Sequence, residues 1–243
     1  MRSAAVPAVD TAIVPVERLD VAFDAQRRWA FADQRRSEID AYWAELVQQN
    51  PGLWNGRVLM LGEFAIADGI FRGTCLEVDY ASFLTWQDWG FPDRSVRDCF
   101  AMGCIQSADG AFLLGVMAAH TFNAGQVYFP CGTPDLNDVA GGQVDLAGSI
   151  KREVAEETGL DIGEFAVEPG WRTILAGSLV AHMKILRARQ SAAELRARIL
   201  DHLAREHEPE LADIRIVRSP ADFDPMMPTF VGTYLRHIWS LAP

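Results

Sequence analysis

The chain has 243 residues, of which 49% are hydrophobic and 23% are charged, and its formal net charge is −11. This composition is typical of a globular protein, with one large domain or one domain carrying an elaboration. The acidic balance argues against a broad surface for nucleic acid or for an anionic membrane.

The first fifty residues predict an extended segment followed by helix. Residues 1–16 are small and punctuated by proline, which favours a mobile end or an extended arm. From about Val16 to Gln49, apolar residues recur among Arg and Glu in a helical pattern. The turn residues Asn50-Pro51-Gly52 end this segment.

The next part of the chain predicts two β-hairpins separated by a short aromatic helix. These five elements are expected at residues 57–64, 70–78, 80–89, 96–106 and 111–118. Ala67-Asp68-Gly69 is a strong turn signal for the first hairpin, because Asp-Gly suits the tight turns that join antiparallel strands. The second hairpin turns around residues 107–110.

The C-terminal half alternates strands with helices. A strand at 126–129 leads through a loop to a helix that begins near Leu146. Later elements are predicted as strands at 164–167, 178–187 and 214–217 and helices at 190–205 and 228–241.

The four cysteines, Cys75, Cys99, Cys104 and Cys131, form no C-x-x-C pair. They are expected to be reduced thiols, and Cys131 is the one nearest the candidate site. No hydrophobic signal segment follows Arg2, and no apolar run approaches the length of a bilayer. We therefore expect a cytoplasmic protein without a membrane partner.

One decapeptide carries most of the functional information. Residues 151–160 read KREVAEETGL, and in a helix Glu153, Glu156 and Glu157 occupy positions i, i+3 and i+4 on one face. Like charges at this spacing repel, and a divalent cation removes the repulsion. Carboxylate oxygens suit Mg²⁺ or Mn²⁺, which usually bind one or two carboxylates together with substrate phosphates.

The same decapeptide resembles the core of the Nudix box, in which Arg-Glu-aliphatic-x-Glu-Glu-x-Gly-aliphatic lies on a helix after a glycine-rich loop. The matching positions are Arg152, Glu153, Val154, Glu156, Glu157, Gly159 and Leu160. The resemblance implies an α/β/α sandwich with a mixed sheet. It also implies metal-dependent hydrolysis of a nucleoside diphosphate linked to another group. Glu156 and Glu157 would be metal ligands, Glu153 a ligand or a base, and Arg152 the residue that orients a carboxylate, by a forked salt bridge to Glu156.

The front half of the box departs from the family pattern. The family has Glu eight residues before the Arg, where this chain has Val144, and its Gly-Gly pair is replaced by Asn137-Asp138. The strand end Tyr128-Phe-Pro-Cys-Gly132 is similar to the family's aromatic-x-Pro-Gly-Gly, and residues 133–142 form an inserted loop. The carbonyl near Gly132 could reach the metal, because glycine permits close approach of the backbone.

Two questions about the front of the site stay open. Asp135 or Asp145 could replace the missing Glu, although Asp145 suits the N-cap of the following helix better. Glu206, Glu208 and Glu210 are expected to be a solvated helix end, although some family members carry the general base on a late loop.

The N-terminal part offers the best clue to the substrate. Residues 1–95 are expected to be a helical and β-hairpin extension and residues 96–243 the Nudix core. The stretch from Asn50 to Trp86 is similar to the start of the eukaryotic Nudix hydrolase of UDP-glucose and UDP-galactose. Expected substrate contacts are Asp135, Lys151, Tyr80 and Trp86, the aromatic rings as platforms for a base.

The sequence therefore predicts a Nudix hydrolase that uses Mg²⁺ or Mn²⁺ and acts on a nucleoside diphosphate sugar such as UDP-glucose. The products would be a nucleoside monophosphate and a sugar phosphate. An ADP-ribose or dinucleotide pyrophosphatase and a non-catalytic nucleotide-sensing module are the alternatives. The expected partner is a small nucleotide, with no nucleic acid, and a homodimer is an option that the N-terminal extension would allow.

Overall fold

The computed structural model describes residues 11–241, and these divide into two compact units, which are described separately. The core unit contains residues 11–17, 101–132 and 147–241, and the second unit contains residues 18–100 and 133–146. The sequence places the boundary between extension and core at 95/96, and in the structure the chain passes from the second unit to the core unit at 100/101. Unlike the prediction, residues 11–17 belong to the core unit and the inserted loop belongs to the second unit. The expectation for residues 1–10 lies outside the described residues.

The core unit is built on an eight-stranded sheet in the order β1-β11-β12-β5-β6-β13, with β10 on β12 and β7 on β6. Its strands are β1 (Thr11–Val16), β5 (Asp98–Gln106), β6 (Phe112–Met117), β7 (Val127–Tyr128), β10 (Ala166–Val167), β11 (Trp171–Ala176), β12 (Leu179–Arg187) and β13 (Leu211–Val217). Strand β1 pairs antiparallel with β11, so that Thr11 faces Ala176 and Val16 faces Trp171.

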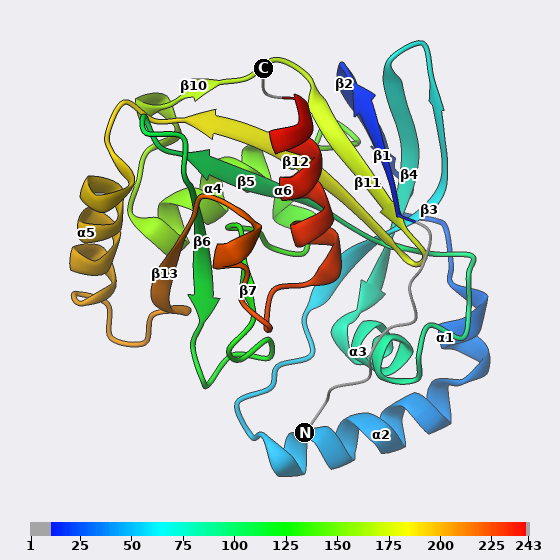
Figure 1. The fold of residues 1–243 in the computed structure, drawn as a ribbon. Coiled ribbons are helices and arrows are strands. Elements are labelled where there is room, and N and C mark those ends of the chain that lie inside the picture. The colour runs from blue at the N-terminus through cyan, green and yellow to red at the C-terminus, as the bar shows by residue number, and fades with distance from the viewer. Residues whose placement is uncertain (1–10, 242–243) are drawn as a thin grey trace. The chain divides into compact units, whose positions relative to one another are not determined.

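Helices cover both faces of this sheet (Figure 1). They are α4 (Leu146–Thr158), α5 (Ala192–Leu203) and α6 (Thr229–Leu241). Gly103 and Cys104 are neighbours in β5 and therefore point to opposite faces. A side chain at Gly103 would meet Val154 of α4, whereas the Cys104 thiol lies next to the Tyr234 hydroxyl of α6. The α/β/α sandwich that the sequence predicts is confirmed.

Helix α5 has both a start signal and an apolar face. Ser191 accepts a hydrogen bond from the Glu194 amide, and the Glu194 carboxylate accepts one from the Ser191 amide at 2.8 Å, which forms a capping box. Ile199 and Leu203, one turn apart, are buried. The helix packs along β13 and β6, and it delivers the chain to a loop at residues 204–210.

The second unit is built on a five-stranded sheet in the order β3-β4-β2-β9-β8. Its strands are β2 (Arg18–Phe23), β3 (Arg57–Ala67), β4 (Ile70–Asp79), β8 (Val139–Ala140) and β9 (Gln143–Val144), and its helices are α1 (Ala30–Gln34), α2 (Arg36–Gln49) and α3 (Tyr80–Asp88). Asp68 and Gly69 have φ of 51° and 71°, the left-handed values that the predicted Asp-Gly hairpin turn requires. Short 3₁₀ turns complete the two units, at Leu136–Asp138, Ile162–Glu164 and Pro220–Asp222.

Two parts of the predicted secondary structure are wrong. Arg18–Phe23 is a strand, not the start of a helix, because it pairs in parallel with β4 from Arg18↔Ile70 to Phe23↔Cys75. The predicted loop at 133–142 contains strand β8 and runs into β9. Gly141 and Gly142, with φ of 58° and 79°, turn the chain between the two strands. A partner distant in sequence decides the conformation of Arg18–Phe23. Strand β8 instead pairs with the adjacent β9, which itself pairs with β2 at Ala22↔Gln143.

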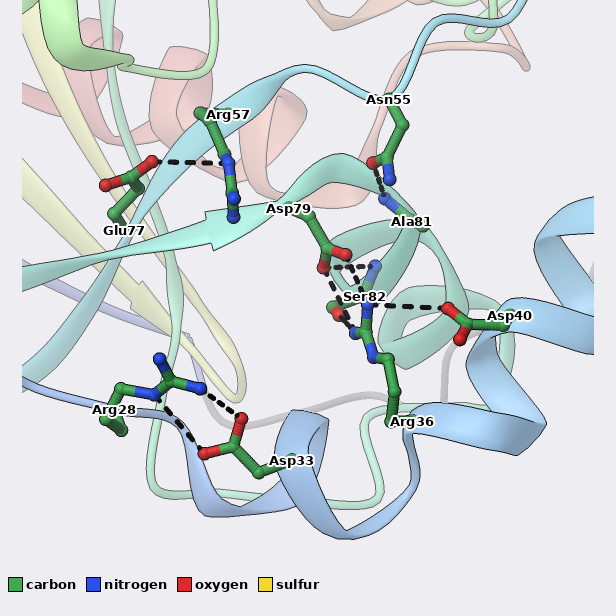
Figure 2. Close-up of polar contacts among 10 residues, drawn as sticks. All are labelled: Arg28, Asp33, Arg36, Asp40, Asn55, Arg57, Glu77, Asp79, Ala81 and Ser82. Carbon is green, nitrogen blue, oxygen red and sulfur yellow. Dashed lines mark hydrogen bonds and ion pairs between the residues drawn. The ribbon is translucent and has the colours of Figure 1, made fainter.

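A network centred on Arg36 ties the helices of the second unit to its sheet (Figure 2). Arg36 Nη1 lies 2.5 Å from Asp79 Oδ2 and 3.5 Å from an oxygen of Asp40, and the guanidinium also binds the Ser82 hydroxyl. Asp79 caps α3 by accepting from the Ser82 amide, and Asn55 Oδ1 accepts from the Ala81 amide at 2.8 Å. The end of β4, the start of α3 and helix α2 are thus held by one guanidinium.

Among residues 11–241, no helix is long and apolar enough to cross a lipid bilayer.

Candidate active site

Helix α4 carries the acidic motif and lies close against the core sheet. Ile150 and Val154 are one turn apart and fully buried, and they form the apolar stripe of the helix. The glycine at position 103 allows this approach, since a Cβ there would lie 2.7 Å from Val154 Cγ2 and 3.1 Å from Ile150 Cγ2. The helix ends where Gly159, with φ of 67°, donates from its amide to the Ala155 carbonyl at 2.9 Å.

The three glutamates of α4 line one hollow of about 410 Å³, but they differ in burial. Glu153 is 8% exposed and Glu157 is 5% exposed, whereas the Glu156 side chain is 63% exposed. Glu153 and Glu157 are one turn apart, which places both carboxylates at the edge of the buried face. The sequence predicts that the three side chains share a face, and the structure brings them to one cavity.

The strand end after β7 lies directly against two of these carboxylates. The Cys131 amide hydrogen-bonds to the Glu157 carboxylate, and Pro130 is held to β5 because its carbonyl accepts from the Gly103 amide at 3.0 Å. At Gly132, a Cβ would lie 2.3 Å from Glu153 Oε1. Only glycine fits at this position without displacing the carboxylate, which supports the prediction that the backbone at Gly132 approaches the site closely.

Burial and like charge together disfavour ionisation of the buried pair. Burial raises the pKa of Glu153 to about 7, with Arg152 opposing the shift and Glu156 and Glu210 adding to it. Burial, followed by the charges of Glu153 and Glu210, raises the pKa of Glu157 well above its ordinary value. A bound cation would stabilise the ionised form of these carboxylates, because it offsets both the desolvation penalty and the repulsion between them.

Arg152 is the cation that contacts these carboxylates from α4 itself. Its Nη1 atom lies 2.6 Å from Glu153 Oε1 and 3.6 Å from Glu156 Oε2. The predicted contact of Arg152 with Glu156 is present as an ion pair, and the shorter contact of Arg152 is to Glu153. Arg152 is therefore placed to orient Glu153 as well as Glu156.

The loop after α5 completes the hollow with four more polar side chains. These are Glu206, His207, Glu208 and Glu210. The loop is fixed at its end, where the Glu210 carbonyl accepts from the Ala118 amide at 2.8 Å. The sequence favours a solvated helix end for this segment, and the side chains of Glu206, Glu208 and Glu210 are exposed. They also line the same hollow as the α4 glutamates, as the alternative of a late-loop base requires.

The donor set suits a hard divalent cation. Carboxylate oxygens dominate the lining, and the missing side chain of Gly132 lets the Glu153 carboxylate lie directly against the backbone. In the described part of the chain, no three Asp, Glu, His or Cys side chains are already grouped as a metal centre. Of the three candidate ligands, Glu156 is the one that turns furthest toward solvent, because its carboxylate is mostly exposed and contacts Arg152.

The residues before α4 provide no carboxylate at position 144. Val144 is buried in β9 and provides no carboxylate. Asp135 caps the 3₁₀ turn at Leu136–Asp138, where its oxygens accept from the Asn137 amide at 2.6 Å and side chain at 3.1 Å. Asp145 directly precedes α4, and its capping role stays a prediction. Both aspartates belong to the second unit.

The predicted substrate contacts differ in their exposure to solvent. Trp86 is completely buried and its indole Nε1 donates to the Asp93 carbonyl at 2.8 Å, so the prediction that it stacks on a base is wrong. Tyr80 is half-buried and packs against Trp43 and Phe83 with ring centroids 6.3 and 5.9 Å away. Phe83 and Trp86 belong to a hydrophobic core cluster of the second unit, and Tyr80 packs against that cluster. Lys151 is exposed on α4 and remains a candidate.

A tyrosine that the sequence did not single out lies beside the buried carboxylates. Tyr128 is buried, its hydroxyl accepts from Asn123 Nδ2 at 3.1 Å, and its pKa is raised by burial and by Cys131, Glu157 and Glu210. Its position in the aromatic-x-Pro stretch was the only signal. The cysteines Cys75, Cys99 and Cys104 are buried and form no disulfide, as predicted, and Cys131 is half-buried.

No protein-family model matches the sequence, and no curated protein is similar enough to be matched. Among solved structures, the Nudix hydrolase RenU from M. smegmatis is 16% identical, with a TM-score of 0.37 and coverage of 60% of this chain and 86% of that chain. DR0079 from Deinococcus radiodurans is 11% identical, with a TM-score of 0.42 and coverage of 76% and 90%. The MutT protein from Methanosarcina mazei Go1 is 16% identical, with a TM-score of 0.39 and coverage of 59% and 95%. At these scores the similarities assign no function.

Proposed function

We propose that this chain is a Nudix hydrolase that cleaves the diphosphate bond of a nucleoside diphosphate derivative with the help of a divalent cation. One observation carries the proposal. The buried carboxylates of Glu153 and Glu157, on a helix with the complete Arg-Glu-x-x-Glu-Glu spacing, line a hollow beside a glycine that leaves room for no side chain. A structural role alone does not explain two adjacent buried carboxylates whose pKa values are both raised.

The residues that would hold Mg²⁺ or Mn²⁺ are Glu153, Glu156 and Glu157, with the backbone at Gly132 as a further oxygen donor. The cation would neutralise the diphosphate and acidify a bound water. Arg152 keeps Glu153 oriented through its 2.6 Å contact. The buried setting of Glu153 and Glu157 excludes competing water from one side of the site.

The chemical step needs a group to take a proton from the attacking water. Water adds to one phosphorus, the bridging P–O bond breaks, and the departing phosphate keeps the bridging oxygen. Glu206, Glu208 and Glu210 on the late loop are candidates for the proton acceptor, since they line the same hollow as the α4 glutamates. Glu153 is the alternative acceptor.

The preferred substrate is a nucleoside diphosphate sugar, with UDP-glucose as the first compound to test. The similarity of residues 50–86 to the UDP-sugar-hydrolysing relative supports this choice. Burial of Trp86 removes one base-stacking contact from the argument. An ADP-ribose or dinucleotide pyrophosphatase would use the same carboxylates with a different base pocket.

The deciding experiment is a screen of nucleoside diphosphate derivatives with Mg²⁺ or Mn²⁺ in H₂¹⁸O, with products read by mass. A hydrolase releases a nucleoside monophosphate and a second phosphorylated product, and the ¹⁸O label marks the phosphorus that water attacked. UDP-sugars, ADP-ribose and dinucleotides form the panel. Failure of the whole panel with both metals would overturn the proposal.

Val144 favours a second candidate, a nucleotide-sensing module without turnover. The family's front glutamate is replaced by a buried valine, so one carboxylate of the box is missing. Calorimetry with UDP-glucose and Mg²⁺ separates the two functions. A sensor binds the nucleotide and releases no UMP on long incubation, whereas a hydrolase releases UMP.

A further inference from the structure

His202, in the last turn of α5, packs its ring over the glycine that ends α4. A Cβ added at Gly159 would lie 2.5 Å from His202 Cγ and 2.6 Å from Nδ1. Gly159 therefore has two roles. Its φ of 67° ends the helix, and its missing side chain makes room for the imidazole.

The same ring makes a polar contact with each side of the acidic hollow. Nε2 lies 3.1 Å from the backbone carbonyl oxygen of Glu156 and 3.4 Å from Glu206 Oε1. A carbonyl oxygen can only accept, so Nε2 carries the proton and donates it. The carbonyl of Glu156 is in the last turn of α4, where carbonyls lack partners within the helix.

The loop that follows His202 is the one that supplies the late carboxylates. The His202 carbonyl accepts from the Arg205 amide at 2.9 Å, and the Leu203 carbonyl accepts from the Glu206 amide at 3.2 Å. The chain then passes along the hollow to Glu210, whose carbonyl is held by Ala118. The side chains of residues 206–208 are exposed. The imidazole of His202 contacts both Glu206 and the backbone of Glu156, and so it connects the start of this loop to α4.

We propose that His202 is a positioning residue that fixes the loop at 204–210 against the glutamate helix, and that this spacing sets the affinity of the site for a divalent cation. The inference rests on the proposed function. His202 does not touch the cation or the substrate. It acts through the backbone of Glu156 and the carboxylate of Glu206, which belong to opposite walls of the hollow.

Packing and hydrogen bonding by His202 can be separated with two substitutions. His202→Phe keeps a ring over Gly159 but loses the Nε2 donor, and His202→Gln keeps a donor without the ring. We expect Mn²⁺ affinity, measured by electron paramagnetic resonance, to fall about 10-fold in His202→Phe, as for other outer-shell groups that orient ligands. His202→Gln should recover part of this loss. His237→Phe, on α6, is the matched control.

A double-mutant cycle tests directly whether the close contact between Gly159 and the His202 ring matters. Gly159→Ala should weaken Mn²⁺ binding about as much as His202→Phe, because the new methyl displaces the ring. In the His202→Ala background the same change should add less than about twofold, since no ring remains to be displaced. Hydrogen exchange of the amides at 204–210, without metal, should accelerate in His202→Phe and not in His237→Phe.

The outcomes distinguish this inference from the proposed function. Wild-type protein that fails to bind Mn²⁺ would overturn both. Wild-type protein that binds Mn²⁺, together with unchanged affinity and unchanged exchange at 204–210 in a folded His202→Phe variant, would overturn the role of His202 alone. Equal effects of Gly159→Ala in both backgrounds would also overturn it, because the glycine would then act only as a helix end.

Discussion

The carboxylate of Asp79 in the second unit and those of Glu153 and Glu157 in the core unit have opposite surroundings. In the second unit, burial works to raise the pKa of Asp79, but hydrogen bonds from Arg36 and Ser82 outweigh it and the pKa is lowered. In the core unit, burial dominates for Glu153 and Glu157 and their pKa values are raised. Asp79, which is buried together with its hydrogen-bond donors, connects helices to the sheet. Glu153 and Glu157, which are buried with too little positive charge nearby, are the candidates for binding a cation.

The strongest test of this contrast is Glu157→Gln. Gln has nearly the same shape and removes a charge that burial disfavours, so the fold and the unfolding temperature should be kept. Hydrolysis of the best substrate should fall at least about 100-fold, because one carboxylate that holds the catalytic cation is lost. Steady-state kinetics and circular dichroism measure the two effects.

Glu45→Gln is the matched control for Glu157→Gln. Glu45 is exposed on α2, and its substitution should leave turnover unchanged. Wild-type turnover in Glu157→Gln would show that this carboxylate is not a ligand and would remove the contrast between the two units.

The second test adds the cation itself. Mn²⁺ at 100 times its dissociation constant should stabilise the protein by about 2.7 kcal/mol, because it binds the folded state and relieves the repulsion between Glu153 and Glu157. Differential scanning calorimetry with Mn²⁺ and with EDTA measures the shift. In Glu157→Gln the shift should shrink, and an equal shift in both proteins would place the ion elsewhere.

The third test breaks a paired carboxylate in the second unit. Arg36→Ala should lower the free energy of unfolding by about 2 kcal/mol, because Asp79 is left largely buried without its main cation. Arg28→Ala is the control, since Arg28 and Asp33 form a pair (Figure 2) whose side chains are largely exposed, and its loss should have a much smaller effect. Urea denaturation of both variants decides whether burial makes the difference.

The smallest expected effect is a pH dependence from Asp98. Burial raises the pKa of this carboxyl to about 7, against a hydrogen bond from Gln87, and one of its oxygens is buried without a partner. Because the folded pKa exceeds the unfolded value of about 3.9, ionisation opposes folding, and stability from this group is lost as the pH rises from about 4 to 7.

Asp98→Asn should therefore be as stable as the wild type at pH 4 and more stable at pH 8. The difference at pH 8 should be about 1 kcal/mol, because the residue keeps some exposure to solvent. Denaturant midpoints across this pH range provide the measurement. A difference that is constant with pH would show that Asp98 does not titrate as the structure implies.

Elements governed by local rules could be predicted from the sequence. The helix of the acidic motif begins at Leu146 as expected, because its carboxylates and apolar residues follow one helical period. The hairpin around Asp68-Gly69 follows from turn chemistry. The acidic spacing also predicted that Glu153, Glu156 and Glu157 share one face of the helix, and in the structure all three line one hollow.

Features that depend on distant partners could not be predicted. Arg18–Phe23 is a strand because it pairs in parallel with β4, which is about fifty residues further along the chain. Trp86 reads equally well as a stacking platform or as core, and only the packing of its neighbours decides. The late loop reaches the site because α5 docks on β13 and the Glu210 carbonyl binds Ala118, contacts that no local pattern encodes.

The order of the two units along the chain has a practical consequence for anyone who wishes to isolate one of them. The polypeptide alternates between the units at 17/18, 100/101, 132/133 and 146/147. No single cut separates the two units, because each is interrupted by a segment of the other. A fragment that starts at residue 96 lacks β1, which pairs with β11, and it carries β9 without its neighbour β2. A fragment that ends at residue 146 keeps every strand of the second unit but also carries residues 101–132 of the core unit. The core unit can acquire its full sheet only from a polypeptide that spans β1 to β13.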